Sequence, residues 1–166
     1  MKERKIEIVV KEYGPGELPE EDRKLVEMAR KASMGSYSPY SRFAVGAAIL
    51  LDNGEIVTGA NQENAAYPSG TCAERTAAFY ASARYPGARF VKLAVAARNV
   101  PGPYVSEQDY DRSFQALPIS PCGACRQALL EYENTDAPTE VILYGRERVM
   151  VFPSIASMLP YCFTEF

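Results

Sequence analysis

The sequence predicts an α/β domain in which helices cover a mixed β-sheet. Two observations favour this fold class: an early pair of apolar segments has the pattern of a β-hairpin, and helical and strand patterns alternate after it. The 166 residues, 47% of them apolar, suffice for a domain with a real core. No segment recurs at a fixed period, so we expect one domain over residues 1–166 rather than a repeat array.

The first part of the chain is predicted to contain an arm, a helix and the hairpin. The arm covers about residues 1–19, and within it residues 5–11 form a loosely alternating extended segment before a Gly-Pro-Gly break. An acidic start followed by spaced apolar residues predicts a helix over 19–35. Residues 43–51 and 56–60 flank an Asn-Gly pair, a strong hairpin signal, so we expect two antiparallel strands there.

The second part of the chain alternates between helix and strand. Residues 71–83 are helical by composition, and residues 90–97 form an apolar run typical of a buried strand. A further helix is expected over 120–133, with Ser120 as its N-cap and Pro121 at its first position. Two short strands and a short helix complete the prediction, at 141–144, 149–152 and 154–158.

Residues 101–117 do not fit this alternation. They combine prolines, tyrosines and acidic residues without a clear period, just before the helix at 120–133. We therefore expect a long excursion, which would serve as a lid, an oligomer contact or simply an insertion.

Charge and hydropathy disfavour some classes of function. The net charge is −3, with 18 basic and 21 acidic residues, whereas a nucleic-acid-binding surface usually needs a basic stripe. We therefore expect a small, weakly charged ligand and no nucleic-acid partner. The longest apolar run, residues 43–51, is about half of the ~18 residues that a membrane span needs. We expect no membrane segment and a cytoplasmic location.

Four cysteines and no histidine are present, so a zinc site would have to use thiolates or carboxylates. Cys72 and the Cys122-x-x-Cys125 pair each follow a helix-start signal, and free N–H groups in a first helical turn favour thiolates. Cys122 and Cys125 share one helix face, and Cys72 would supply a third ligand. Two alternatives stay open: the pair could be a redox or structural half-site, and Cys162 could be a fourth ligand that closes the site.

A carboxylate follows the first of these cysteines. Three protein ligands leave tetrahedral zinc with an open position for water, whose pKa zinc lowers towards ~7. Glu74 is placed to take that proton and redeliver it, provided that Cys72 stands at the very start of its helix. The alternative is that Thr71-x-x-Glu74 is only a capping box.

The combination of motifs is more specific than either motif alone. Cys-x-Glu and Pro-Cys-x-x-Cys, about fifty residues apart with a strand between them, form the zinc-deaminase signature in its three-cysteine version. With the segments SYSPYSRFAVGAA, NQENAAYP, CAERTA and SPCGACRQ, the chain resembles the cytidine deaminase family of the small homotetrameric type. The resemblance runs from about residue 21 to residue 163, and only the arm and the excursion depart from it.

This resemblance implies a fold, a cofactor and a set of catalytic residues. The fold would be a three-layer α-β-α arrangement with a five-stranded mixed sheet. Each subunit would hold one Zn²⁺ on Cys72, Cys122 and Cys125, while Glu74 moves the proton. Arg75 would hydrogen-bond a zinc-bound sulfur and offset the charge of three thiolates.

The resemblance also implies the substrate contacts. Asn61 and Glu63 would hold the ribose 3′-hydroxyl, which an amide and a carboxylate can take as donor and acceptor together. Phe43 would lie against the pyrimidine ring, Ala73 would touch the substrate, and Phe163 would reach the site of a neighbouring subunit. Without the resemblance, Asn61 and Glu63 are equally well explained as polar residues that end a strand. Phe43 could likewise be a core residue.

The implied reaction is zinc-dependent hydrolytic deamination of cytidine and 2′-deoxycytidine to uridine and 2′-deoxyuridine, with release of ammonia, in pyrimidine salvage. Two rival functions stay open: an enzyme of the same fold that acts on a nucleoside antibiotic or on a base in nucleic acid, and a zinc-stapled binding module without chemistry. The sequence identifies no residue that would read the 2′ position, so the preference between cytidine and deoxycytidine is open. The homotetramer is implied by the resemblance alone.

Overall fold

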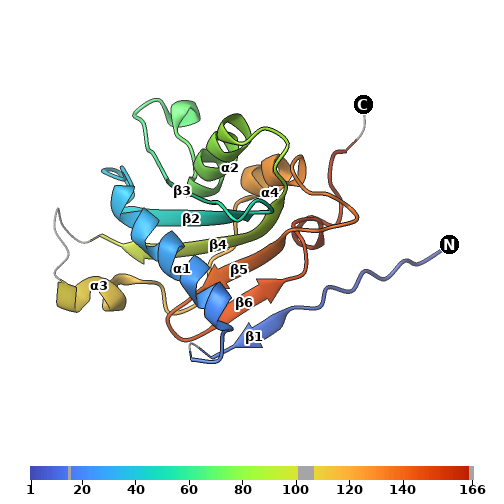
Figure 1. Ribbon diagram of the computed structural model, residues 1–166, viewed down its shortest axis with the longest axis horizontal. Helices are drawn as coiled ribbons and strands as arrows, with labels where there is room; N and C mark the ends of the chain where they lie inside the picture. The colour runs from blue at the N-terminus through green and yellow to red at the C-terminus, as the bar shows by residue number, and fades with distance from the viewer. Residues whose placement is uncertain (15, 101–106, 165–166) are drawn as a thin grey trace.

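A six-stranded mixed sheet forms the centre of the chain, for which the computed structural model describes residues 1–14, 16–100 and 107–164. Its strand order is β1-β6-β5-β4-β2-β3; β4 and β5 run parallel, and the other neighbours are antiparallel (Figure 1). The strands are β1 (Lys11–Tyr13), β2 (Phe43–Leu51), β3 (Ile56–Ala60), β4 (Phe90–Asn99), β5 (Glu140–Tyr144) and β6 (Val149–Phe152).

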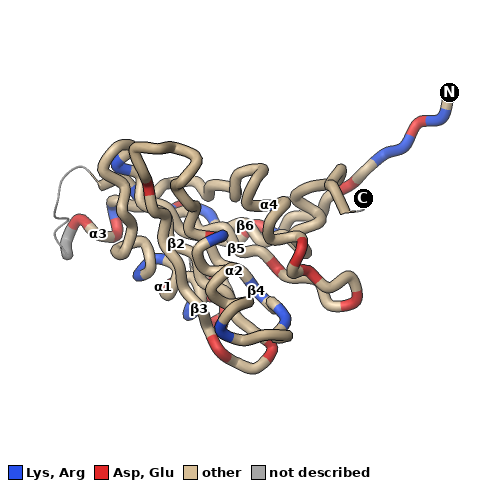
Figure 2. Tube along the Cα trace, turned by 90° about the horizontal axis from the view of Figure 1, so that it is seen from above, with Lys and Arg blue, Asp and Glu red and all other residues tan. Residues whose placement is uncertain are grey.

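The sheet has one strand more than predicted. β1 pairs with β6, so that Lys11 lies opposite Val151 and Tyr13 opposite Val149. The expected extended segment at 5–11 is misplaced, because only Lys11 of it enters this strand. Tyr13 packs against the apolar cluster of the sheet, whereas residues 1–9 are exposed and leave the body as an arm (Figure 2). Pairing with β6 and the packing of Tyr13 therefore place the strand after the apolar run rather than within it.

Helices cover both faces of the sheet, which confirms the predicted three layers. α1 (Glu20–Ala32) crosses one face, while α2 (Ala73–Arg84) and α4 (Gly123–Leu130) cover the other (Figure 1). The helix predicted at 19–35 and the two hairpin strands are confirmed. The remaining helical elements are α3 (Glu107–Ser113) and the 3₁₀ turns η1 (Ser33–Gly35), η2 (Tyr67–Ser69) and η3 (Ala156–Met158).

The central strands are buried on both faces because their side chains alternate. Ile49 and Val95 belong to the apolar cluster beneath α2 and α4. Their neighbours Ala48 and Ala94 belong to the cluster beneath α1. Small side chains on the α1 face let this helix approach the sheet closely. The sheet is therefore packed between α1 on one face and α2 and α4 on the other.

The excursion is more regular than predicted. It contains α3, and Phe114 directly after this helix is 2% exposed and joins the core beneath α1. The guanidinium of Arg30 lies over the rings of Tyr110 and Phe114, at 5.3 and 4.7 Å from their centroids. An expectation based on period alone missed this helix, because long-range aromatic contacts stabilise it. Residues 101–106 of the excursion lie outside the described residues.

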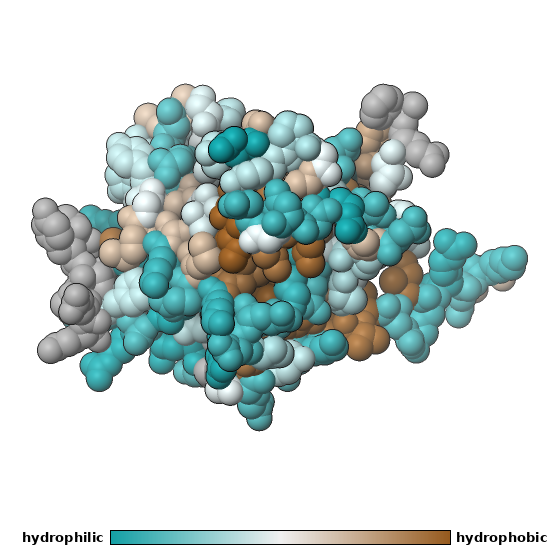
Figure 3. Space-filling model, in the orientation of Figure 1, coloured by the Kyte–Doolittle hydropathy of each residue, from teal (hydrophilic) through white to brown (hydrophobic). Residues whose placement is uncertain are grey.

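The surface fits the modest net charge. Acidic and basic residues are interspersed along the trace (Figure 2), and hydrophilic residues cover much of the face that carries α1, with apolar residues visible between them (Figure 3). Of the helices in the described part of the chain, none has the length and apolar character needed to cross a bilayer.

Gly46 of β2 provides a test of the close approach of α1. A Cβ at this position would fall well inside van der Waals contact of the Ala29 carbonyl oxygen and the Ser33 nitrogen, both of which are backbone atoms. Gly46→Ala should therefore lower the free energy of unfolding by about 3 kcal/mol or more, measured by denaturant titration. Gly16→Ala is the matched control, because its Cβ would meet no atom within 4 Å. Equal stability of the two variants would contradict this packing.

Candidate metal centre and active site

Three cysteines meet where α2 and α4 begin. Cys72 is the N-cap of α2 and Cys122 is the N-cap of α4, while Cys125 lies one turn further and is fully buried. The predicted cap at Ser120 is wrong, since α4 begins two residues later. The reason is local: the sulfur of Cys122 accepts the backbone N–H of Cys125 at 3.4 Å and so caps the helix itself.

The positions of the three sulfur atoms fit a zinc ion. The Sγ atoms of Cys72, Cys122 and Cys125 all lie within 4.8 Å of one another, and those of Cys72 and Cys122 are 4.0 Å apart. Tetrahedral zinc with Zn–S bonds of about 2.3 Å places its sulfur ligands about 3.8 Å apart, so small side-chain movements would complete the coordination. Within the described residues this cluster does not include Cys162, which is exposed in the C-terminal segment.

Protonation of these thiols is mutually dependent. A hydrogen bond from Cys125, and further bonds from Arg75 and Cys122, lower the pKa of the Cys72 thiol to about 5. The bond to the Cys72 sulfur and burial in turn raise the pKa of Cys125. One thiolate therefore keeps its neighbour protonated, because like charges at this separation oppose each other. A divalent cation between the sulfurs would remove the conflict, which agrees with a metal site.

Glu74 lies in the first turn of α2, two residues after its N-cap Cys72. Cys72 therefore stands at the very start of its helix, as the predicted role of Glu74 requires. The alternative, a capping box formed by Thr71 and Glu74, is wrong, because Cys72 and not Thr71 is the N-cap. The side chain of Glu74 is only 4% exposed. Burial, together with the charge of Cys72, raises the pKa of its carboxyl to about 7. A carboxyl with such a pKa can both accept and donate a proton near neutral pH.

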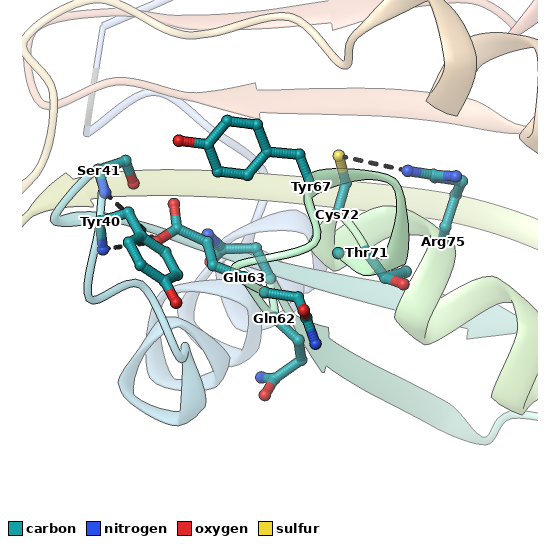
Figure 4. Close-up of a pocket in the computed structure, with 11 residues that line it drawn as sticks. Tyr40, Ser41, Gln62, Glu63, Tyr67, Thr71, Cys72 and Arg75 are labelled. Carbon is teal, nitrogen blue, oxygen red and sulfur yellow. Dashed lines mark hydrogen bonds between the residues drawn. The ribbon is translucent and has the colours of Figure 1, made fainter.

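Arg75 approaches the cluster from the same turn. Its Nη2 atom lies 3.9 Å from the Cys72 sulfur, and this hydrogen bond is the main cause of its raised pKa (Figure 4). Three thiolates and one Zn²⁺ would carry a net charge of −1, which the guanidinium offsets. The position agrees with the predicted contact between Arg75 and a ligand sulfur.

An open pocket of about 600 Å³ lies beside Cys72, within the usual size range of small-molecule sites. In Figure 4 the rings of Tyr40 and Tyr67 stand near the Glu63 carboxylate, and Cys72 lies on the opposite side of the pocket from Tyr40. The lining includes Tyr40, Ser41, Asn61, Glu63, Tyr67, Cys72 and Arg75. The structure thus brings two predicted sugar contacts and a predicted zinc ligand to one cavity.

The Asn61 amide holds the start of β2 in place. Its Oδ1 accepts the Val45 N–H at 2.8 Å and the Ser36 hydroxyl at 2.6 Å, and its Nδ2 donates to the Phe43 carbonyl at 3.0 Å. Among the described residues, the Phe43 carbonyl is the one acceptor of this NH₂ group, so its second hydrogen could bind a ligand. The half-buried Phe43 is therefore fixed by the same residue that faces the pocket, although its own side chain is not part of the described lining.

Not every predicted residue reaches the pocket. The side chain of Phe163 is 65% exposed, and its backbone forms two hydrogen bonds with the side chain of Gln127 on α4, away from the pocket lining. Ala73 is fully buried at the start of α2. Conversely, sequence reasoning assigned no function to Tyr40, Ser41 and Tyr67, although they lie within the segments that carry the family resemblance.

Comparison with known proteins identifies the family. A family model described as the cytidine and deoxycytidylate deaminase zinc-binding region matches residues 19–140, which is most of the chain. The chain belongs to the cytidine deaminase family. The match contains all three clustered cysteines and Glu74, so zinc is the metal that the family assigns to this centre.

Individual relatives agree with the family. The chain is 37% identical over 142 residues to a cytidine deaminase of Sporosarcina psychrophila, covering 86% of this chain and 90% of that protein. It is 40% identical to a cytidine deaminase of Halalkalibacterium halodurans, and the match covers 84% of this chain and 92% of that protein. A crystal structure of the cytidine deaminase from Burkholderia pseudomallei aligns with a TM-score of 0.66 at 37% identity, covering 85% of this chain and 98% of that one. The crystal structure of the cytidine deaminase from Mycobacterium tuberculosis aligns with a TM-score of 0.63 at 32% identity, covering 86% of this chain and 97% of that one.

Two cysteine variants test which thiols hold the metal. Cys122→Ser should lose zinc, because a hydroxyl is a poor replacement for a thiolate ligand. Cys162→Ser should keep about one zinc ion per chain, since its sulfur lies outside the cluster. Metal content is measured by elemental analysis after gel filtration in a metal-free buffer. Zinc loss from the Cys162 variant would instead indicate a closed four-cysteine site.

Proposed function

We propose that this chain catalyses the zinc-dependent hydrolytic deamination of cytidine and 2′-deoxycytidine to uridine and 2′-deoxyuridine, releasing ammonia. The observation that carries the proposal is the buried Glu74 carboxyl next to three clustered sulfurs, of which that of Cys72 belongs to the lining of an open pocket. Relatives that are 37–41% identical to the chain are cytidine deaminases, and they support the same reaction.

The proposed mechanism depends on one proton carrier. Zinc held by Cys72, Cys122 and Cys125 would lower the pKa of water and so supply the nucleophile at neutral pH. Glu74 takes a proton from the attacking water and delivers it to N3 of the ring as the new C4–O bond forms. Glu74 then moves the proton of the new C4 hydroxyl to the exocyclic amine, so that the C4–N bond breaks, the C4=O bond of the product forms and ammonia leaves. A carboxyl with a pKa of about 7 is suited to both transfers.

The proposed nucleoside contacts lie along the pocket. Asn61 offers its remaining amide hydrogen and Glu63 offers a carboxylate oxygen, so together they bind the sugar 3′-hydroxyl. Phe43 would contact the pyrimidine ring, and Ala73 would contact the substrate beside the proton carrier. An ionised Glu63 carboxylate disfavours a phosphate at the sugar, which supports a free nucleoside over a polynucleotide.

Several finer predictions accompany this function. The subunits would form a homotetramer in which Phe163 reaches the site of a neighbour, as its exposure and its distance from its own pocket lining permit. The enzyme would act in the cytoplasm in pyrimidine salvage. The chain would form one domain over residues 1–166.

Replacing the proton carrier tests the mechanism. Glu74→Gln keeps the shape of the side chain but cannot carry a proton, so kcat/KM for cytidine should fall by about 10²–10⁴-fold or more. Zinc content should not change, because Glu74 is not a ligand. Ammonia release and metal content are measured on the same preparation. A variant with normal turnover would exclude this function, and so would a wild-type chain that binds nucleosides without converting them.

A comparison of substrates tests the substrate class. Cytidine and 2′-deoxycytidine should both be deaminated, whereas a cytosine-containing oligonucleotide should not, because its 3′-phosphate would meet the Glu63 carboxylate. An aminoacylated cytosine nucleoside represents the nucleoside-antibiotic alternative. Product formation is followed by chromatography for all four compounds. Reaction of the oligonucleotide alone would replace the nucleoside proposal with nucleic-acid deamination.

A further inference from the structure

A single helical turn at one end of the pocket ends in an unusual backbone conformation. The turn covers Ser38–Arg42, and the N–H of Arg42 donates to the Ser38 carbonyl at 3.0 Å. Arg42 has a φ of 54°, and no other non-glycine residue in the described ranges has a positive φ. A five-to-one hydrogen bond that closes on a left-handed residue is a common way to end a helical turn, but glycine usually occupies that place. Here an arginine does.

The start of this turn holds a carboxylate of the pocket. The first N–H groups of a helical turn have no partner within the turn, and Pro39 has none to offer. The next two N–H groups, from Tyr40 and Ser41, both donate to Oε2 of Glu63, at 2.9 and 3.3 Å (Figure 4). A hydrogen bond from the Ser41 side chain and these two amides lower the pKa of Glu63. The two amides therefore fix the carboxylate through Oε2, and within the described residues neither of them occupies Oε1, which leaves that oxygen as the acceptor for a ligand.

The far end of the turn is anchored to the sheet. The carbonyl of Arg42 accepts the N–H of Val100 at 2.8 Å, and the N–H of Phe43 donates to the Ser41 hydroxyl at 3.0 Å. Arg42 forms the first of these contacts with its own carbonyl and is enclosed by the second, so its φ sets the direction in which the turn meets β2. A different φ at this residue would rotate the Tyr40 and Ser41 amides away from Glu63.

The side chain of Arg42 is not what connects it to the pocket. It is exposed and makes no hydrogen bond or ion pair with any residue in the described part of the chain. The guanidinium is also not part of the described pocket lining. The conformation of the backbone, rather than the charge, is thus the property of Arg42 that acts on the pocket.

We propose that Arg42 is a positioning residue: its left-handed backbone directs the Tyr40 and Ser41 amides onto Glu63 and so makes the pocket selective for a sugar with a free 3′-hydroxyl. The proposal rests on the proposed function, in which Glu63 accepts that hydroxyl. A hydroxyl can donate to the free carboxylate oxygen, whereas a 3′-phosphate would bring a like charge to it. The turn therefore contributes to substrate selection without touching the substrate.

Two substitutions at Arg42 separate backbone conformation from charge. Glycine adopts a positive φ readily, so Arg42→Gly should keep the turn while removing the guanidinium. A β-branched residue rarely adopts a positive φ, so Arg42→Val should change the conformation of the turn. The Tyr40 and Ser41 amides would then lose their hydrogen bonds to Glu63. Both variants lose the same charge, which makes them matched controls for each other. Should Arg42→Val fail to fold, as judged by circular dichroism and thermal unfolding, Arg42→Thr offers a polar β-branched replacement.

Steady-state kinetics with cytidine and 3′-deoxycytidine provide the first measurement. Arg42→Val should raise KM for cytidine about tenfold with little change in kcat, as expected for the loss of a binding contact, while Arg42→Gly stays within about twofold of wild type. With 3′-deoxycytidine, which lacks the hydroxyl, all three proteins should behave alike. An equal KM increase for both substrates, equal damage by glycine and valine, or no effect of valine would each overturn the proposal.

The ionisation of Glu63 provides a measurement that needs no turnover. Carboxyl carbon NMR, assigned with Glu63→Gln, should give a low pKa for Glu63 in the wild type and in Arg42→Gly. In Arg42→Val the pKa should move up towards the value of an ordinary glutamate. An unchanged pKa in the valine variant would overturn the positioning by Arg42 even if both nucleosides are converted. If neither nucleoside is converted, the proposed function fails, and this titration still decides whether Arg42 positions Glu63.

Discussion

Mutual repulsion between sulfurs is the constraint on which the rest of this site depends. Cys72, Cys122 and Cys125 are close enough that they cannot all be ionised without a cation among them. Two helix N-termini and the Arg75 guanidinium surround them, and both favour negative charge at the sulfurs. The protein thus provides three ligands and part of the compensating charge, and a divalent metal supplies the rest. The negative charge of Cys72 in this cluster also helps burial to raise the pKa of the nearby Glu74 carboxyl to about 7.

The sheet makes this cluster possible by bringing two distant helices to one place. α2 packs against β3 so closely that a Cβ at Gly59 would lie 2.5 Å from the Ala77 nitrogen and 2.7 Å from the Ala73 carbonyl. The start of α2 is therefore fixed relative to the sheet, and Cys72 and Glu74 are fixed with it. On the opposite face, small residues let α1 pack closely and cover the other side of the same strands. Packing on both faces of the sheet thus fixes the positions of the Cys72 sulfur and the Glu74 carboxyl.

The substrate side of the pocket follows a different principle, in which polar backbone groups replace packing. Asn61 binds the backbone of Phe43 and Val45, and Glu63 binds the amides of the adjoining turn. Each side chain therefore maintains the loop that shapes the pocket, and in the described part of the chain each has one further polar group without a hydrogen bond. This double use explains how side chains on an exposed loop can be held rigidly enough for recognition. It also makes an exposed backbone conformation, that of Arg42, relevant to binding.

The sequence by itself determined the fold class, the hairpin, most helices and the chemistry of the metal centre, because period, turn residues and motif spacing are local properties. It misplaced the first strand and missed α3, because these features depend on contacts between residues far apart in the chain. It put the start of α4 at Ser120, because the sulfur of Cys122 caps this helix instead. Only the tertiary structure decided that Cys162 lies outside the sulfur cluster and that Glu74 is buried. It alone also showed that the amides of one turn hold Glu63. The physical reason is common to all of these: burial, charge and hydrogen-bond partners are set by neighbours in space.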